Sequence, residues 1–396
     1  MKIIHILGDS KYGGAAKSII RLAQLWGKAG WEAQILTTDP QFQAAAAAAG
    51  VRTVPVDCIW RDIRPLQDLI GLYRLWRFLR QGGFTVAHTH TTKAGFVGRL
   101  AARLAGVPVV IHTVHGFAFH ERSSPAKIAF YTVLETVAGW CCHRIITVSE
   151  FHREWAMQLR IAPASKLKAI PNGIPDPPGG PSVSAIRSTL GLGPDDIFLF
   201  TPGRVAEEKG LEELVEAMKM LRERGLGNVR LLFAGDGPLL PELRRRVEER
   251  GLQENVRFLG FREDISDLLR AADIVALPSW REGLSIALLE SMCAGRPIIA
   301  STIGSNKEAL GARDGQGACG LFVNPGDAPG LAESIEKLVV HPALRDSLGA
   351  RARGRWQLHY SSERTLAAHE RTYQELLRSR GRMDPLAAAL PARNSQ

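Results

Sequence analysis

Short apolar runs alternate with longer amphipathic stretches along most of the chain. The runs include KIIHIL at 2–7, TVAHTH at 85–90 and IFLFTPGR at 197–204, whereas AAKSIIRLAQLWGKAG at 15–30 is typical of the stretches between them. Runs rich in β-branched residues predict strands, and apolar residues spaced three and four apart predict helices. Strands that follow one another through helices pair in parallel, so the pattern predicts α/β domains with helix-covered parallel sheets.

One segment interrupts this alternation and divides the chain. IPDPPGGPSVS at 174–184 is rich in Pro, Gly and Ser, and strand and helix patterns resume after it. Single cores stop growing near about 250–300 residues, so 396 residues favour two domains. We predict two Rossmann-like, doubly wound parallel-sheet domains, with the following boundaries: a first domain at 1–173, a linker at 174–185, a second domain at 186–345, C-terminal helices at 346–380 packing back on the first domain, and a flexible tail at 381–396.

Charge distinguishes the two halves. Residues 1–180 hold 21 Lys and Arg against 11 Asp and Glu, while the rest of the chain holds 29 of each class, so the net charge of +10 belongs to the first half. This excess favours an anionic partner. No nucleic acid is expected, because no arginine-rich arm, zinc finger or aromatic RNA-binding signature accompanies it. An anionic membrane surface or a phosphorylated substrate fits better.

Membrane insertion and secretion are not predicted. No run reaches the ~20 apolar residues of a membrane span, and the first residues form a strand pattern instead of a signal peptide. The five cysteines lack CxxC spacing, which indicates reduced core residues in a cytoplasmic protein. The stretch at 64–84 combines arginines with Trp76, Phe78 and leucines. It predicts either an interfacial helix at the inner face of the membrane or a helix packed on the sheet with a basic outer face.

Candidate binding residues of the second domain lie in loops that follow strands, where doubly wound domains bind ligands. TPGRVAEEKG at 201–210 places Arg204 and Lys209 before a helix, a pattern suited to a diphosphate, although solvated surface charges are the alternative. The loop GDGP at 235–238 allows close approach of backbone to a ligand, or forms an ordinary turn. Phe261 and Arg262 follow another strand, and their flat groups could lie against a base, although surface packing is the more usual explanation for either.

The stretch REGLSIALLE at 281–290 carries two glutamates around an apolar run. Gly283 and Leu284 lie at the predicted helix start, where their amides can meet phosphate or sugar oxygens. Glu290 comes about two turns later and is expected to be buried, so it needs a partner, and ribose hydroxyls would suit it. Glu282 precedes the helix. The alternative is a rim charge and a helix-surface charge with no ligand.

The first domain offers a glycine pair and several histidines. Gly13 and Gly14 follow the first strand, but their spacing is not GxGxxG, so they form either a ligand-facing loop or a plain turn. His115 ends a predicted strand, as do His88 and His90; strand-end histidines are more often structural than catalytic. An HxH pair without a carboxylate is weak evidence for a metal. The chain contains no DxD, so we expect neither a metal nor another cofactor.

Several motifs together resemble the retaining glycosyltransferases of family 4. They are GGA at 13–15, VHGF at 114–117, VSE at 148–150, PNGI at 171–174, GR with KG at 203–210, GDGP at 235–238 and EGLSIALLE at 282–290. The resemblance implies a GT-B fold: two facing Rossmann-like domains, the acceptor domain first and the donor domain second, with a C-terminal helix crossing back. VHGFAFHE is similar to bacterial surface-polysaccharide members.

The resemblance also implies roles for individual residues. Arg204 and Lys209, with Gly203 between strand and loop, would hold the donor diphosphate, Glu290 the ribose and Glu282 the transferred sugar. Gly14 would lie near the phosphate and His115 near the sugar; Gly235, Gly283 and Leu284 would line the donor site. Ser285 replaces a glycine common in the family motif, which affects how closely a ligand can approach that helix start.

The implied reaction transfers a hexose or N-acetylhexosamine from a nucleotide-sugar, with UDP-sugars favoured, to a glycan or polyprenyl-linked acceptor in cell-surface glycan biosynthesis, such as lipopolysaccharide. No paired carboxylates suited to double displacement are evident, so front-face substitution is favoured. The alternatives are a nucleotide-sugar epimerase of the same architecture and a non-catalytic sugar-binding subunit. The missing GxGxxG argues against an NAD-dependent oxidoreductase.

Overall fold

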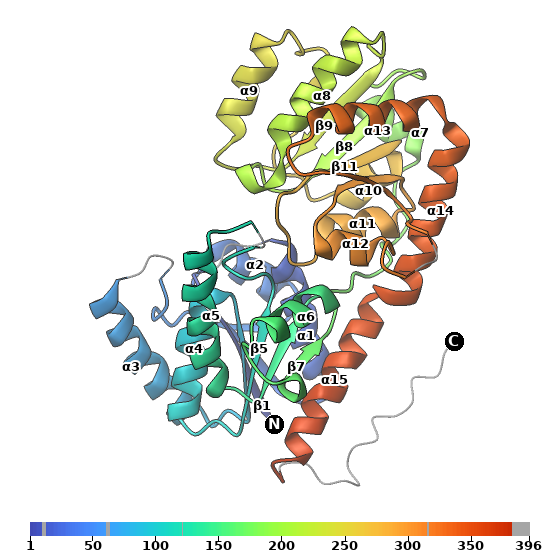
Figure 1. Ribbon diagram of the computed structural model, residues 1–396. Helices are drawn as coiled ribbons and strands as arrows, with labels where there is room; N and C mark the ends of the chain where they lie inside the picture. Colours follow the sequence, from blue (N-terminus) through green and yellow to red (C-terminus); the bar gives the residue numbers. More distant parts are fainter. Residues whose placement is uncertain (10–12, 61–63, 121, 315–316, 382–396) are drawn as a thin grey trace. The chain divides into compact units, whose positions relative to one another are not determined.

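The computed structural model describes residues 1–9, 13–60, 64–120, 122–314 and 317–381. Its contacts divide the chain into two compact units. The first unit comprises Met1–Gly173 together with the segment from Glu363 onward, and the second unit comprises Ile174–Ser362 (Figure 1). The five cysteines are all free. Throughout the described ranges, no helix combines the length and the apolar character that crossing a membrane requires.

The first unit is built on a seven-stranded parallel sheet in the order β3-β2-β1-β4-β5-β6-β7. Its strands are β1 (Lys2–Gly8), β2 (Glu32–Thr37), β3 (Arg52–Val54), β4 (Val86–His90), β5 (Val109–Val114), β6 (Arg144–Thr147) and β7 (Leu167–Ala169). The helices that cover it are α1 (Gly14–Lys28), α2 (Pro40–Ala48), α3 (Pro65–Gly82), α4 (Thr92–Leu104), α5 (Pro125–Trp140), α6 (Glu150–Gln158) and α15 (Ser362–Arg378), and a short η1 (Ala164–Lys166) precedes β7.

The second unit repeats this plan with a six-stranded parallel sheet in the order β10-β9-β8-β11-β12-β13. Its strands are β8 (Ile197–Pro202), β9 (Val229–Ala234), β10 (Val256–Phe258), β11 (Ile274–Leu277), β12 (Ile298–Ser301) and β13 (Leu321–Val323). Its helices are α7 (Val183–Thr189), η2 (Glu207–Lys209), α8 (Leu211–Glu223), α9 (Leu240–Glu249), α10 (Ile265–Ala271), α11 (Ile286–Cys293), α12 (Gly304–Ala309), α13 (Ala328–Val340) and α14 (Pro342–His359).

Local sequence signals account for many of these elements. The central strands are uninterrupted apolar runs because helices cover both faces of a parallel sheet, and Ile3, Ile4 and Ile6 of β1 are fully buried. Helix α5 begins where Ser124 accepts a hydrogen bond from the amide of Lys127 and a proline occupies the first helical position. Capping and hydrophobic period therefore agree, which is why the element order is readable from the sequence.

Each sheet changes winding direction at one point. In the first unit the chain winds outward from β1 through β2 to β3 and then returns to the other side of β1 with β4; in the second unit the change lies between β8 and β11. Doubly wound sheets bind ligands at the carboxyl ends of the two strands that flank this point. The loops that follow β1, β4, β8 and β11 are therefore the places to look for a site.

The C-terminal helices differ from the sequence-based boundaries. Residues 346–380 were expected to pack on the first domain, but α14 belongs to the second unit and packs against α11. The approach is close: a Cβ on Gly349 would lie 2.2 Å from the carbonyl oxygen of Gly295. Only α15 joins the first unit, where Tyr373 stacks on Trp26 with ring centroids 4.6 Å apart. The amphipathic pattern revealed two helices but not which core each one covers.

The predicted linker at 174–185 is also shorter in the structure. Ile174 forms a parallel bridge with Ser361 inside the second unit. Helix α7 already begins at Val183, because Ser182 accepts a hydrogen bond from the amide of Ala185 and caps it. The Pro- and Gly-rich composition of this segment masked that capping signal.

Candidate functional site

Two loops meet at the winding change of the second unit. One follows β8 and spans 203–210, and the other follows β11 and spans 278–285. Gly210 has a left-handed φ of +64°, and a Cβ there would lie 2.3 Å from the carbonyl oxygen of Pro278. The amide of Trp280 donates to the carbonyl of Glu208 at 2.8 Å. Only glycine permits this approach, so the sequence KG at 209–210 joins the two loops.

The charged side chains predicted for this edge come together. Lys209 forms an ion pair with Glu282, and both are mostly shielded, with 22% and 17% of their side chains exposed. The hydroxyl of Ser279 donates to the same carboxylate at 3.1 Å. A recess beside this pair is lined by Thr201, Pro202, Gly203, Arg204, Lys209, Leu211, Leu277, Pro278 and Ser279. A fixed cation and a carboxylate thus lie side by side at the carboxyl ends of β8 and β11.

Arg204 is held by its own loop. It pairs with Glu208 and remains half-exposed, at 53% of its side-chain area. Burial alone would raise the pKa of Glu208, but a backbone hydrogen bond and the Arg204 guanidinium lower this pKa overall. Glu208 therefore stays ionised and steers Arg204, whose remaining donors are available to an anion in the recess.

The glycine loop after β9 is joined to its neighbours through main chain. Gly235 donates its amide proton to the carbonyl of Gly260 at 2.7 Å, and a Cβ on Gly235 would lie 1.8 Å from the carbonyl oxygen of Gly203. The amide of Val205 donates to the carbonyl of Asp236 at 2.9 Å. The loops after β8, β9 and β10 consequently form one connected surface, for which the sequence offered only a glycine-rich turn.

Arg262 lies beyond β10 and is fixed in orientation. Its guanidinium donates to both carboxylate oxygens of Asp264, at 2.8 and 2.6 Å, and this hydrogen bonding raises the pKa of Arg262. The side chain is 38% exposed, and neighbouring Phe261 is 67% exposed. A held, planar cation beside an exposed ring is suited to stacking against a flat group.

The helix that follows β11 begins as predicted, but Glu290 is placed differently. Ser285 caps α11 by accepting from the amide of Leu288 at 3.4 Å, so the residue that departs from the family glycine stabilises the helix start. Gly283 and Leu284 lie buried just before it. Glu290 was expected to be buried but is half-buried, because the inward face of α11 is formed by other side chains, among them Leu288, Leu289 and Met292.

Two family profiles match the chain in succession. Glycosyltransferase Family 4 matches residues 12–176, and Glycosyl transferases group 1 matches residues 182–355. The UDP-Gal:α-D-GlcNAc-diphosphoundecaprenol α-1,3-galactosyltransferase of Escherichia coli is 33% identical over 261 residues, covering 65% of this chain and 67% of that protein. The chain belongs to the family 4 glycosyltransferases. The putative glycosyltransferase EpsD of Bacillus subtilis is 31% identical over 308 residues, covering 76% of this chain and 79% of EpsD.

Solved structures confirm the fold prediction. HepE of Anabaena, crystallised with UDP and glucose, matches this glycosyltransferase with a TM-score of 0.81 at 22% identity over 95% of this chain and all of that one. WaaG, a glycosyltransferase involved in lipopolysaccharide biosynthesis, gives a TM-score of 0.71 at 16% identity, covering 92% and 98%. The fold is GT-B, with two Rossmann-like units.

The winding change of the first unit holds the predicted His115 together with His90, which the sequence analysis weighed as more often structural, and His5, which it did not consider. His115 follows β5, and its Nε2 is 3.1 Å from Nδ1 of His90. His90 in turn reaches Nδ1 of His5 with its Nε2, also at 3.1 Å. Nearby His369 on α15 is buried as well. His5 could have been found only from the pairing of β1 with β4, in which His5 is the register partner of His88 in the HTH segment.

These histidines are neutral. Burial, and to a smaller extent His369, lowers the pKa of His5 to about 3 and that of His115 to about 4. Burial also lowers the pKa of His88 and His90 well below the ordinary value. At neutral pH each ring therefore carries one N–H and one lone pair, and none is a cation.

Among the described residues, one group of potential ligands lies close enough together to hold a metal ion, namely His5, His88 and His90. Their nitrogens are largely engaged: His88 contacts the hydroxyl of Tyr373 through Nδ1 and that of Thr113 through Nε2, and His5 is bonded to His90. No carboxylate belongs to the group. The donor set therefore fits a hydrogen-bond network better than a metal centre.

The glycines predicted for the first unit lie at the start of α1. Gly13 is the N-cap residue with extended backbone, and Gly14 is the first helical residue. A Cβ on Gly13 would meet nothing within 4 Å, so packing does not demand glycine at this position. Residues 10–12 of the same loop lie outside the described residues.

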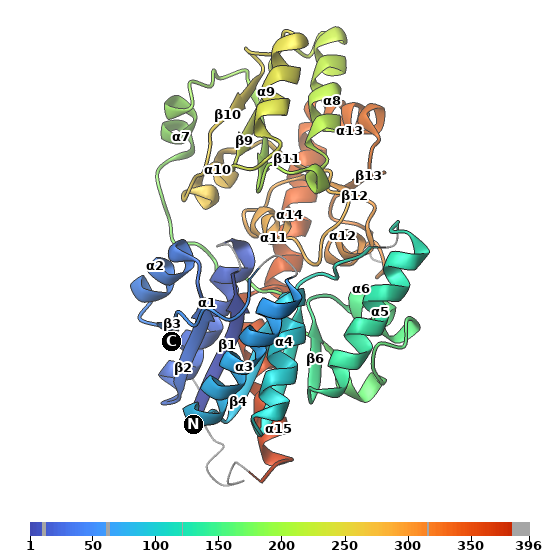
Figure 2. The same cartoon turned by 90° about the vertical axis from the view of Figure 1, so that its left-hand side faces the viewer.

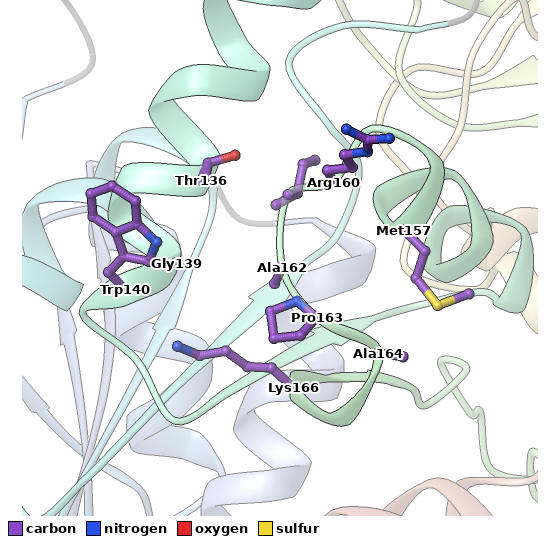
Figure 3. A pocket seen from close by; sticks show the side chains of 10 residues that line it. Thr136, Gly139, Trp140, Met157, Arg160, Ala162, Pro163, Ala164 and Lys166 are labelled. Atoms are coloured by element: carbon purple, nitrogen blue, oxygen red, sulfur yellow. The ribbon is translucent and has the colours of Figure 1, made fainter.

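A second recess, of about 360 Å³, lies elsewhere in the first unit (Figure 3). It is formed by the end of α5 and the segment after α6, and Trp140, Arg160 and Lys166 are among its lining residues. These residues precede β6 and β7 or lie beside their amino ends, opposite to the carboxyl ends where doubly wound domains bind substrates. Because of this position, we do not assign the recess to the donor, although it is large.

Proposed function

We propose that this glycosyltransferase transfers a hexose or N-acetylhexosamine from a UDP-sugar, with retention of configuration, to a lipid-linked or polysaccharide-precursor acceptor in bacterial cell-surface glycan biosynthesis. The observation that carries the proposal is the shielded pair of Lys209 and Glu282 at the winding change of the second sheet, with Arg204 lining the adjoining recess. The E. coli relative, named for UDP-Gal and a diphosphoundecaprenol-linked acceptor, supports the substrate classes.

The donor is assigned from the base to the sugar. Arg262, oriented by Asp264, lies against the base, and Glu290 accepts hydrogen bonds from the ribose hydroxyls. Arg204 and Lys209 neutralise the diphosphate, helped by the amides before α11, and Glu282 binds the transferred sugar. Apart from Glu290, which lies in α11, these groups follow the ends of strands, where this sheet class places its ligands.

Catalysis in this scheme is electrostatic. As the bond between sugar and phosphate breaks, negative charge builds on the diphosphate, and Lys209 is already positioned to stabilise it. No second carboxylate is assigned to a covalent intermediate, so the acceptor attacks from the face that the diphosphate leaves, and the leaving phosphate takes the acceptor proton. Fixed cations supply the charge, and the reaction needs no metal ion.

Peripheral attachment to an anionic membrane forms part of the proposal. Helix α3 packs inward through Gly71, Leu75 and Leu79. Its outer face exposes Leu66, Leu69, Ile70 and Tyr73, at 80%, 65%, 51% and 56%, in the i, i+3, i+4, i+7 spacing of a single apolar stripe. Arg74, Arg77 and Arg80 are exposed on the same helix. A purely basic outer face would not need this apolar stripe, whereas an interfacial helix does.

A second stripe supports the same orientation. Helix α5 exposes Phe130, Val133, Val137 and Trp140, at 58%, 61%, 41% and 74%. Helices α3 and α5 both pack against α4, so the two stripes flank one helix layer of the first unit (Figure 2). We expect this layer to face anionic lipid, which brings a polyprenyl-linked acceptor to the protein.

The transfer reaction is tested with UDP-galactose, UDP-glucose and UDP-N-acetylglucosamine, each with and without a GlcNAc-diphosphate-lipid acceptor. We expect acceptor-dependent release of UDP with at least one donor and a product whose anomeric configuration, read by NMR coupling constants, is that of the donor. A chelator should leave the rate unchanged. Interconversion of UDP-sugars without acceptor would indicate the epimerase, and binding without turnover would indicate a sugar-binding subunit.

Membrane attachment is tested by flotation with vesicles that contain anionic lipid. We expect binding that weakens as salt rises and is lost in the double variant Leu66→Ser and Leu69→Ser. A matched control is Leu358→Ser, which changes a leucine of α14 in the second unit that is 63% exposed. Equal flotation of the double variant and the control would refute the assignment to α3.

A further inference from the structure

Three imidazoles form a continuous hydrogen-bonded chain in the first unit. His5 on β1 contacts His90 on β4 through Nδ1 and Nε2, and His90 contacts His115 after β5 through its remaining nitrogen; both distances are 3.1 Å. The rings of His5 and His90, and those of His90 and His115, are stacked at centroid separations of 5.4 and 5.3 Å. The chain therefore uses both nitrogens of its central ring.

Each end of the chain is a buried nitrogen without a protein partner. Within the described part of the protein, Nε2 of His5 and Nδ1 of His115 lack a hydrogen-bond partner. Leaving a buried donor or acceptor unsatisfied costs roughly 1–3 kcal/mol. One of these ends, Nδ1 of His115, belongs to a predicted substrate-binding residue. The cost of leaving it unsatisfied indicates that a ligand atom completes the hydrogen-bonded chain there.

Proton counting allows the neutral chain only two states. Three neutral rings carry three N–H groups, and two of these fill the two hydrogen bonds. If His5 donates to His90, then His90 donates to His115, and the third proton lies on Nδ1 of His115. If the direction reverses, Nδ1 of His115 becomes an acceptor and the third proton lies on Nε2 of His5. The tautomer of His115 is thus coupled to that of His5, which it does not contact.

The surroundings keep the chain neutral. The groups that face it are His88 from β4, His112 from β5, and His369 and Tyr373 from α15, all of them buried. Arg99, a fixed cation, faces His112. Among the described residues no carboxylate acts on the three rings, so protonation of any ring would create a buried cation without a counter-charge there. The chain can shift protons internally but cannot gain one cheaply.

We propose that His5 and His90 are positioning residues that set the tautomer of His115, so that Nδ1 of His115 donates or accepts one hydrogen bond to a ligand hydroxyl at this edge of the first sheet. The assignment of that partner rests on the proposed function, whereas the coupling of the three rings does not. His115 binds through a neutral hydrogen bond and transfers no proton to the substrate. Reversal of the chain lets it match either polarity without a change in charge.

The coupling is tested by ¹⁵N NMR of histidine-labelled full-length protein, which distinguishes protonated from bare ring nitrogens. We expect His115 to occupy one neutral tautomer from pH 8 to pH 5.5. In His90→Phe, His115 should populate both neutral tautomers, and in His115→Phe the resonances of His5 should shift. Unchanged His5 resonances in His115→Phe would overturn the coupling. His341→Gln, an exposed histidine of the second unit, is the control.

The link to catalysis has a separate readout. We expect His90→Phe to lower kcat for transfer by about tenfold, the effect of one lost hydrogen bond, while the affinity for UDP without sugar stays unchanged. His5→Gln, whose amide offers both a donor and an acceptor, should retain more activity than His5→Phe. If every variant folds and transfers at the wild-type rate, the positioning role is refuted. If the wild type transfers nothing, only the proposed function fails, because the NMR result stands alone.

Discussion

Replacing Lys209 with alanine removes the cation that the structure holds most firmly at the proposed diphosphate site. Its ammonium is paired with Glu282, and Gly210 fixes the loop that carries it by a main-chain approach that no other residue allows. The cation is therefore positioned before substrate binds. Loss of one such preorganised electrostatic contact typically costs ~3–4 kcal/mol of transition-state stabilisation, or about 100- to 1000-fold in kcat.

The same change has a smaller effect on folding. With Lys209 gone, Glu282 keeps the hydroxyl of Ser279 but loses its counter-charge in a mostly shielded position. We expect a loss of stability of about 1 kcal/mol, below that of a fully buried pair, because solvent still reaches both side chains. Activity should thus fall far more than stability.

The assay is acceptor-dependent UDP release, accompanied by thermal unfolding of each variant. Lys219→Ala is the matched control, since Lys219 forms an exposed pair with Glu223 in the same unit. A double-mutant cycle with Glu282→Gln then separates the interaction energy of the ion pair from the effect of each residue alone. If Lys209 and Glu282 serve diphosphate and sugar, the double variant should lose more activity than either single one. A rate for Lys209→Ala within threefold of wild type would refute the assignment.

Two further perturbations test the connected loops and the buried imidazoles. Gly235→Ala places a Cβ 1.8 Å from the carbonyl oxygen of Gly203. Calorimetry should show a loss of about 2 kcal/mol in stability, and kinetics should show a raised KM for the donor. The control is Gly225→Ala, also at positive φ but in open space, which should leave this KM unchanged. In the folded protein the pKa of His5 (about 3) and of His115 (about 4) lies below the unfolded value. The free energy of unfolding should therefore fall as the pH drops below 6.5, by about 1 kcal/mol per buried histidine at pH 5.5. Urea titrations at each pH measure this change. A flat profile from pH 7 to 5.5 would contradict this.

The element order was predictable because it depends on local sequence. Apolar runs such as IFLF and caps such as Ser124 specify strands and helix starts without reference to distant residues. The rule that parallel strands present their loops at one edge then brought Lys209 and Glu282 together before any coordinates were known. Charged motifs on consecutive strand-end loops are thus the part of the site that sequence patterns capture well.

Features that depend on tertiary partners were not predictable in the same way. The helical pattern predicts α14, which packs on the second unit, and α15, which packs on the first, but it does not say which core each helix covers. Glu290 is half-buried because other side chains of α11 form its inward face, and hydrophobic spacing alone did not show which residues these are. His5 is an ordinary member of an apolar strand until its pairing with β4 places it beside the HTH segment.

The two winding changes use opposite electrostatics, and this difference follows from burial. At the second sheet the loops leave Lys209 and Arg204 partly exposed, so charge is inexpensive to keep and is available to an anionic diphosphate. At the first sheet the equivalent edge is lined by imidazoles that burial keeps neutral, which suits hydrogen bonding to hydroxyl groups. A nucleotide-sugar carries both chemistries, a charged end and a neutral end. One fold repeated twice therefore carries different electrostatics at the same topological position, because burial differs there.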